Sequence, residues 1–207
     1  GPRPSRQLQQ CSGKVNLLID IQNNIKAQQS AGYQRWATIE NLKRASATMN
    51  FLTEHGIGSY EELLDRCEAA SASVARLKAD LRDTGAKIDE LALKMKHVST
   101  YRQLKPIYNR YKASRDKEKF LRGHESEIIL FEAAARECKR LGAVPLPATE
   151  RMQAEMDELN VRKAALKAEL QKAQREEQDY AAMRRNVEDF LSTPQQEQER
   201  KKNVELE

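Results

Sequence analysis

The feature that most constrains the fold of this chain is a series of apolar residues that recur at alternating steps of four and three along residues 59–100. Such a heptad pattern places every member on one stripe of an α-helix, and that stripe packs against another helix in a coiled coil. The members are Leu63, Cys67, Ala70, Val74, Leu77, Leu81, Thr84, Ile88, Leu91, Met95 and Val98. They predict one long helix with a single seam that faces a partner helix.

A second seam of the same kind runs through residues 149–191. Its apolar members are Met152, Met156, Leu159, Leu166, Leu170, Ala173, Tyr180 and Val187. Lys163, Glu177 and Arg184 interrupt it, and such polar side chains either fix the register of the pairing or leave a gap that another helix fills. Because the two seams have matched lengths, we expect them to pair antiparallel within one chain. The alternative is pairing with a second chain, as a homodimer.

Two shorter helical stripes precede the first seam, within residues 14–58. Their apolar members are Val15, Leu18, Ile21 and Ile25 in the first, and Tyr33, Trp36, Ile39, Leu42, Ala45, Met49 and Leu52 in the second. We expect the two stripes to form a helical hairpin that ends at Gly56, since glycine commonly terminates a helix. Ser59 and Glu62, three positions apart, then predict a capping box at the start of the long helix.

The composition agrees with a helical chain. Charged residues make up 32% of the sequence, which holds only 8 Gly and 6 Pro, and residues that favour helices dominate it. We therefore predict an all-α fold with a helical N-terminal hairpin, a long antiparallel coiled-coil hairpin in residues 59–100 and 149–191, and a small helical tip in residues 101–148. Residues 1–13 are expected to be a flexible lead with a tag scar, and residues 192–207 a disordered polar tail.

Several function classes lack support in this sequence. It contains no GxSxG, GxxxxGK[ST] or HExxH pattern, and no GxGxxG after a predicted strand, so we expect no catalytic residue and no enzyme activity. The histidines and cysteines never fall at metal-ligand spacing, so no metal and no cofactor is expected. Three cysteines, an odd number and far apart, favour a reducing, cytoplasmic compartment. No apolar run is long enough to span a membrane.

The concentrated chemical signal is "YRQLKPIYNRYKASRDKEKFLRGHE", residues 101–125, hereafter the basic segment. Its bases are Arg102, Lys105, Arg110, Lys112, Arg115, Lys117, Lys119 and Arg122. With three acids, the segment has a net charge of +5, equal to the formal charge of the whole chain. Cations neutralise phosphates and aromatic rings stack on bases, so these residues, with Tyr101, Tyr108 and Tyr111, are candidates to bind nucleic acid. In the alternative, the segment is a solvated part of a helical scaffold or of a protein-docking surface, and Tyr108 and Tyr111, three residues apart, face the core of the tip.

Local signals also predict the elements of the tip. Pro106 fits the first turn of a short helix that holds Tyr108 and Tyr111. A helix is expected over residues 124–141 with Gly142 as its stop. Its inward residues are predicted to be Ile128, Phe131, Ala135 and Cys138.

Three long segments of the sequence resemble the C-terminal region of relaxase (mobilisation nuclease) proteins from mobile elements of Gram-positive bacteria. They are "KVNLLIDIQNNIKAQQSAGYQRWATIENLKRASATMNFLTEHGIGSYEELL", "STYRQLKPIYNRYKASRDKEKF" and "HESEIILFEAAAR". They stand in the same order as in that family, and the resemblance covers most of residues 14–190.

The resemblance implies a role in conjugative transfer. The catalytic tyrosine and the histidine-rich metal site of such relaxases lie in an N-terminal nuclease domain that has no counterpart in this sequence, so no catalytic residue is carried over. The implied partners are DNA, either single-stranded or from the transfer origin, and relaxosome accessory or coupling proteins. The resemblance leaves open which of these the helical region contacts.

Overall fold

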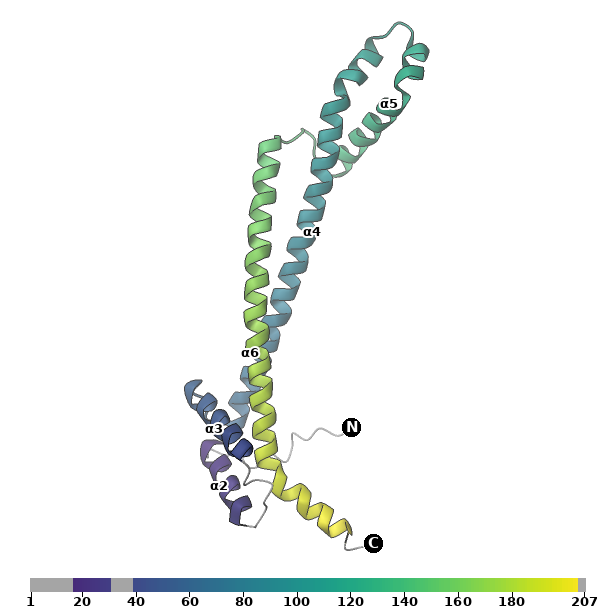
Figure 1. Ribbon diagram of the computed structural model, residues 1–207. Helices are drawn as coiled ribbons and strands as arrows, with labels where there is room; N and C mark the ends of the chain where they lie inside the picture. The colour runs from purple at the N-terminus through teal and green to yellow at the C-terminus, as the bar shows by residue number, and fades with distance from the viewer. Residues whose placement is uncertain (1–16, 31–38, 205–207) are drawn as a thin grey trace. The chain divides into compact units, whose positions relative to one another are not determined.

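The computed structural model describes residues 17–30 and 39–204, and the side chains of residues 17–26 and 39–191. Figure 1 shows its helices in chain order: α2 (Leu17–Ser30), α3 (Ile39–Glu54), α4 (Tyr60–Ala113), α5 (Lys117–Arg140) and α6 (Thr149–Val204). The described residues contain no strand. The predicted all-α class is therefore confirmed. The predicted lead in residues 1–13, and Val15, Tyr33 and Trp36 of the two predicted stripes, lie outside the described residues.

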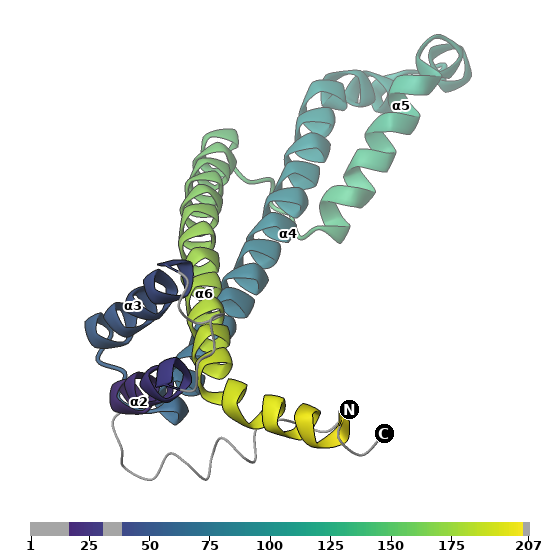
Figure 2. The same ribbon diagram turned by 60° about the horizontal axis from the view of Figure 1, so that its bottom comes forward.

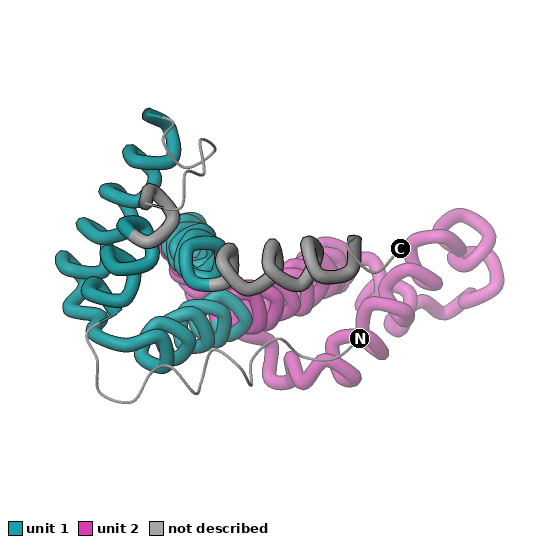
Figure 3. Tube along the Cα trace, turned by 90° about the horizontal axis from the view of Figure 1, so that it is seen from below, with its two compact units in different colours: residues 1–76, 170–207 teal, residues 77–169 magenta. Residues whose placement is uncertain are grey.

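The chain divides into two compact units, which Figure 3 colours separately. Unit 1 comprises Gly1–Arg76 and Leu170–Glu207, and unit 2 comprises Leu77–Glu169. The two long helices, α4 and α6, each contribute one stretch to both units. Each unit is therefore built around a segment of α4 and a segment of α6 from the same chain.

In unit 1 the segments of α4 and α6 run antiparallel, and α2 and α3 pack beside them (Figure 2). The Tyr60 hydroxyl donates to Glu188 Oε1 at 2.5 Å and the Ser71 hydroxyl donates to Glu177 Oε1 at 2.7 Å. As the residue number rises along α4, the residue number of the partner on α6 falls, so the two helices are antiparallel. The buried core consists of Leu17, Ile21, Ala45, Leu52, Ile57, Tyr60, Leu63, Tyr180, Val187 and Phe190.

In unit 2 the stretches of α4 and α6 are also antiparallel (Figure 1). The buried core comprises Leu91 and Val98 of α4, Met152 of α6, and Cys138 and Ala143. The predicted pairing of α4 with α6 is thus present in both units.

The heptad seams account for this pairing. All eleven members of the α4 seam, from Leu63 to Val98, are buried or half-buried. So are the apolar members of the α6 seam. Of the polar interruptions, Glu177 accepts the hydrogen bond from Ser71, and Arg184 Nε donates to Glu188 Oε1 at 2.7 Å. The Ser71–Glu177 bond crosses from α4 to α6 and fits the interpretation that polar seam residues fix the register, whereas the Arg184–Glu188 bond lies within α6.

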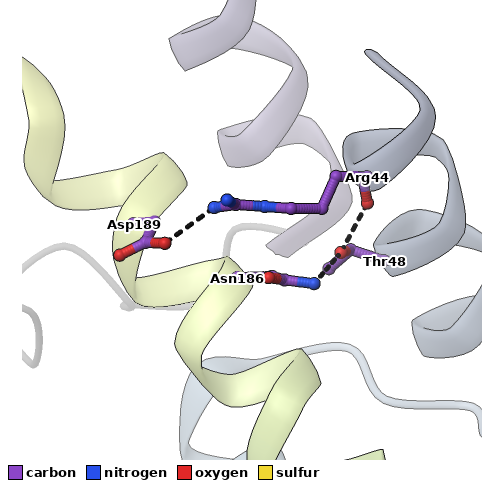
Figure 4. A network of polar contacts seen from close by, with 4 residues as sticks. All are labelled: Arg44, Thr48, Asn186 and Asp189. Carbon is purple, nitrogen blue, oxygen red and sulfur yellow. Dashed lines mark hydrogen bonds and ion pairs between the residues drawn. The ribbon is translucent and has the colours of Figure 1, made fainter. Parts of the chain in front are cut away.

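A polar network joins α3 to α6 in unit 1 (Figure 4). Arg44 Nη2 lies 2.7 Å from Asp189 Oδ2, and Asn186 Nδ2 donates to Thr48 Oγ1 at 3.1 Å. The Thr48 hydroxyl in turn donates to the Arg44 carbonyl at 2.8 Å. The Arg44 guanidinium also lies 5.1 Å from the ring centroid of Phe190, whose side chain is fully buried. The cation is therefore held by groups of its own chain.

The predicted helix ends are largely found. The Glu62 amide donates to Ser59 Oγ at 3.1 Å, while Glu62 Oε2 accepts from the Gly58 amide at 2.7 Å. The capping box therefore forms, with its return bond shifted by one residue. Gly56 and Gly142 follow α3 and α5 with φ of 63° and 67°, in the left-handed region that favours glycine.

Besides the earlier start of α5, at Lys117 rather than at residue 124, three features differ from the prediction. First, α4 continues through Pro106 to Ala113, so no separate short helix begins there. Second, Ile39 and Leu42 are exposed, because α3 meets the core of unit 1 only from Ala45 onward. Third, α6 extends beyond the predicted end of the second seam, as far as Val204.

Candidate nucleic-acid interface

The basic segment lies wholly in unit 2, where it forms the last turns of α4, the connection at Ser114–Asp116 and the first turns of α5. Figures 1 and 2 both show α5 alongside this part of α4. The connection is short because Asp116 caps α5: its Oδ1 accepts from the Lys119 amide at 3.0 Å. The Ser114 hydroxyl donates to the Asp116 carbonyl at 3.0 Å. These bonds set α5 running back along α4.

The aromatic rings of the basic segment pack between the two helices. Phe131 of α5 is buried, at 5% exposure, and its ring centroid lies 4.7 Å from that of Tyr101 and 4.2 Å from that of Tyr108. Tyr111 continues the row, 6.1 Å from Tyr108 and 6.2 Å from Phe120. The three tyrosines are half-buried. They therefore contribute apolar contacts to the packing of α4 against α5.

Two lysines stand over the tyrosine rings in a repeated arrangement. Lys105 Nζ lies 5.5 Å from the centroid of Tyr101, and Lys112 Nζ lies 5.6 Å from the centroid of Tyr108. Each lysine follows its tyrosine by four residues, one helical turn, and the second pair follows the first by seven residues. Both lysines remain exposed. Each ring thus supports the stem of a side chain whose ammonium group is in water.

An arginine of α4 makes the same kind of contact with α5. The Arg110 guanidinium lies 5.8 Å from the centroid of Phe120, and the centroid of the His124 imidazole lies 4.6 Å from that of the same ring. His124 Nδ1 lies 2.8 Å from Glu127 Oε2, at a kink where the backbone of His124 leaves helical geometry. Arg110 is exposed, so its charge also faces water.

Arg102 is the member of the set that has hydrogen-bond partners in its own chain. Its Nη2 donates to the Pro147 carbonyl and its Nη1 to Thr149 Oγ1, both at 2.5 Å. These bonds tie α4 to the first residue of α6. We therefore assign Arg102 a structural role in addition to its positive charge.

The remaining four cations surround the start of α5. Arg115 lies in the connection, and Lys117, Lys119 and Arg122 lie in the first turns of the helix, all exposed. A helix N-terminus carries a partial positive charge and favours anions. Cations there raise the positive potential further, so an external anion close to this helix end would be stabilised.

The eight cations of the basic segment form no ion pair with any residue of the described part of the chain. Elsewhere the pattern differs: Arg44 pairs with Asp189, Arg140 with Glu137, and both members of each pair are close enough for a direct hydrogen bond. A cation without a counter-charge in its own chain is available to an anionic partner at no cost of breaking an existing pair.

The role of Phe131 as the ring on which two tyrosines pack is a contact that the spacing of the bases does not indicate. A signal for it exists in the sequence, however. The steps of three and four continue from the seam through Tyr101, Leu104, Tyr108 and Tyr111, all of them half-buried. This pattern supports the alternative in which Tyr108 and Tyr111 face the core of the tip.

Comparisons of the chain with protein-family models, with curated proteins and with solved structures find no match. Within the described residues, no group of three His, Cys, Asp or Glu side chains could hold a metal ion. None of the helices described here has the length and apolar character needed to cross a membrane.

Proposed function

We propose that this chain is a non-catalytic helical module of a conjugative relaxase, acting in the cytoplasm, and that its basic segment helps to hold transfer-origin DNA. The resemblance of three long sequence segments to the C-terminal region of relaxases supports the assignment as a relaxase module. One observation carries the second part: eight exposed cations lie in 25 residues and form no ion pair within the described part of the chain.

The physical basis is counterion release. Each cation that neutralises a phosphate displaces a condensed counterion. The release of counterions favours binding entropically and makes the affinity depend steeply on the salt concentration. The aromatic rings under three of the cations favour binding further, because Lys105, Arg110 and Lys112 each lie over a ring. Side chains that are held in place lose less conformational freedom on binding than free ones do.

The test is fluorescence anisotropy with labelled single-stranded and duplex oligonucleotides from a transfer origin, titrated over salt. We expect binding at about 0.15 M salt, with the logarithm of affinity falling linearly with that of the salt concentration. In a variant with Lys105, Arg110, Lys112 and Arg115 changed to Gln, this line should be less steep. The magnitude of its slope should fall by about 3 to 4, because each phosphate contact contributes about 0.9.

A matched control separates this site from general charge. Changing Lys87, Arg162, Lys167 and Arg175 to Gln also removes two lysines and two arginines, all of them exposed and outside the basic segment. This control should retain the salt slope of the original chain, and far-UV circular dichroism should show equal helicity in all three proteins. Equal loss of binding in both variants would reject the basic segment as the DNA site.

A second candidate function is a scaffold that docks the relaxase to an accessory or coupling protein without DNA contact. The observation in its favour is a pair of exposed apolar residues on α5, Ile129 at 55% and Leu130 at 54% exposure. Changing both to Ser should abolish capture of a purified coupling or accessory protein if this candidate is right. The four Gln substitutions in the basic segment should then leave capture unchanged.

The proposal assigns no nuclease activity to this chain. A nicking assay of the pure protein with supercoiled transfer-origin DNA and Mg²⁺ or Mn²⁺ should give no product. Reproducible cleavage that follows the protein through purification would overturn the non-catalytic assignment.

A further inference from the structure

The way in which the basic segment would contact DNA follows from the surroundings of its rings. A base that stacks on an aromatic side chain needs an open ring face. The Tyr108 ring has Phe131 stacked on it, with 4.2 Å between centroids, and the ammonium group of Lys112 over it at 5.6 Å. Tyr101 has the same two kinds of neighbour, Phe131 at 4.7 Å and Lys105 at 5.5 Å. A stacking base would have to displace one of them.

The cations, in contrast, need no rearrangement to meet an anion. Lys105 and Lys112 are one heptad apart on α4, which separates them by about 10 Å along the helix axis. Their stems cover the rings while their charges remain exposed. Arg110, over Phe120, follows the same rule with its charge exposed. At Tyr101 and Tyr108, this surface therefore offers a ligand positive charge without a free ring face.

The geometry points to a surface that binds the phosphate backbone of DNA and does not stack on bases, with duplex DNA as its preferred form. This inference rests on the proposed function and specifies its substrate. Duplex DNA carries one charge per about 1.7 Å of its axis, whereas a single strand carries one per about 3.4 Å. Without base stacking to compensate, the form with the higher charge density binds more tightly, and the base sequence has little influence.

The experiment compares four probes on the unmodified chain: a duplex of mixed sequence, a duplex of unrelated sequence, and the separated strands of the first. We expect both duplexes to bind with affinities within about threefold of each other, and the single strands to bind more weakly than the duplex. A 2-aminopurine base in the middle of a strand should show no change of fluorescence on binding that reports stacking on a ring.

Two variants distinguish charge from stacking. Tyr108→Leu keeps an apolar side chain against Phe131 and should leave the affinity for duplex unchanged within about twofold, because no base uses the ring. Lys105→Gln together with Lys112→Gln should lower the salt slope for duplex by about 2. Circular dichroism of each variant controls for folding, and Tyr101→Leu provides a second test if Tyr108→Leu loses helicity.

The outcomes are distinct. Single strands that bind about tenfold more tightly than duplex, with that preference lost in Tyr108→Leu, would overturn backbone binding while leaving DNA binding by the basic segment intact. Absence of salt-sensitive binding to any probe would overturn both the inference and the proposed function. Duplex preference with a reduced slope in the double lysine variant supports both.

Discussion

Unit 1 and the basic segment of unit 2 use the same residue types in opposite ways. In unit 1, Arg44 lies over the buried ring of Phe190 and also pairs with Asp189 at 2.7 Å. In the basic segment, Lys105 and Lys112 lie over tyrosine rings but have no ion pair among the described residues. The difference teaches that the cation–ring contact is common to both regions, whereas the counter-charge is what separates a structural cation from an available one.

The comparison extends to the acids. In unit 1, Glu188 accepts hydrogen bonds from both the Tyr60 hydroxyl and the Arg184 guanidinium. In the basic segment, the carboxylate of Asp116 is used by the backbone, as the cap of α5. Glu188 and Asp189 of unit 1 therefore pair with cations, while Asp116 of the basic segment fixes a helix end.

The largest expected effect is on stability and concerns the ring of Phe190 in unit 1. Phe190→Ala should lower the free energy of unfolding by about 3–5 kcal/mol, because it opens a cavity at a fully buried position. Phe120→Ala in the basic segment should cost clearly less, since Phe120 is only half-buried. Urea unfolding followed by circular dichroism measures both. If the two changes lowered the free energy of unfolding equally, Phe190 would not contribute more to stability than Phe120 does.

The sequence predicts the pairing of α4 and α6 well, for a physical reason. A seam of residues from Leu63 to Val98 encodes one helix face through local spacing alone, and two seams of equal length can satisfy each other. Local signals also locate the glycine stops at Gly56 and Gly142. These features need no knowledge of which distant residues meet.

What the sequence does not predict are contacts between residues far apart in the chain. The bond between Arg44 and Asp189 joins positions 145 residues apart, and no spacing rule indicates it. Pro106 shows a competing effect: alone it suggests a helix start, but Tyr101 and Tyr108 on either side both pack on Phe131. We infer that these tertiary contacts hold one helix across the proline, despite the lost backbone bond.

The second effect in size concerns Tyr60, which is buried and donates to Glu188. Burial, and then the Glu188 carboxylate, raise the pKa of Tyr60 from 10.0 to about 12. Tyr60→Phe removes a hydrogen bond to a charged acceptor and should cost about 1–2 kcal/mol at neutral pH. This change also removes a titrating group from unit 1.

The pH dependence gives the sign of the Tyr60 contribution. Because the pKa is higher in the folded chain than in the unfolded chain, the stabilisation is complete below about pH 10 and is lost as pH rises toward about 12. The free energy of unfolding of the original chain should therefore fall more steeply over this range than that of Tyr60→Phe. Titration of lysines is common to both proteins and cancels in the difference. Parallel curves would contradict the raised pKa.

Asp116 allows the cap and the charge of the basic segment to be separated. Asp116→Ala should lower stability by about 1 kcal/mol, because the Lys119 amide loses its acceptor. Asp116→Asn retains a capping oxygen and should remain close to the original stability. Both variants remove one negative charge, so both should bind DNA at least as tightly as the original chain. Weaker binding by Asp116→Asn would show that the carboxylate itself takes part in the site.

The smallest expected effect on stability tests the comparison most directly. Lys112→Gln should cost about 0.5 kcal/mol or less, because it removes one exposed cation from the Tyr108 ring. It should nevertheless lower the salt slope of DNA binding by about 0.9, the contribution of one phosphate contact.

Arg44→Gln is the matched change in unit 1, and its two effects should be reversed. Loss of the ion pair with Asp189 and of the contact with Phe190 should cost about 1 kcal/mol, while the salt slope stays unchanged. Urea unfolding and anisotropy titrations on both variants provide the four values. If Arg44→Gln lowered the slope as much as Lys112→Gln does, the counter-charge would not decide which cations are available to DNA, because a paired cation would then serve an external anion as readily as an unpaired one.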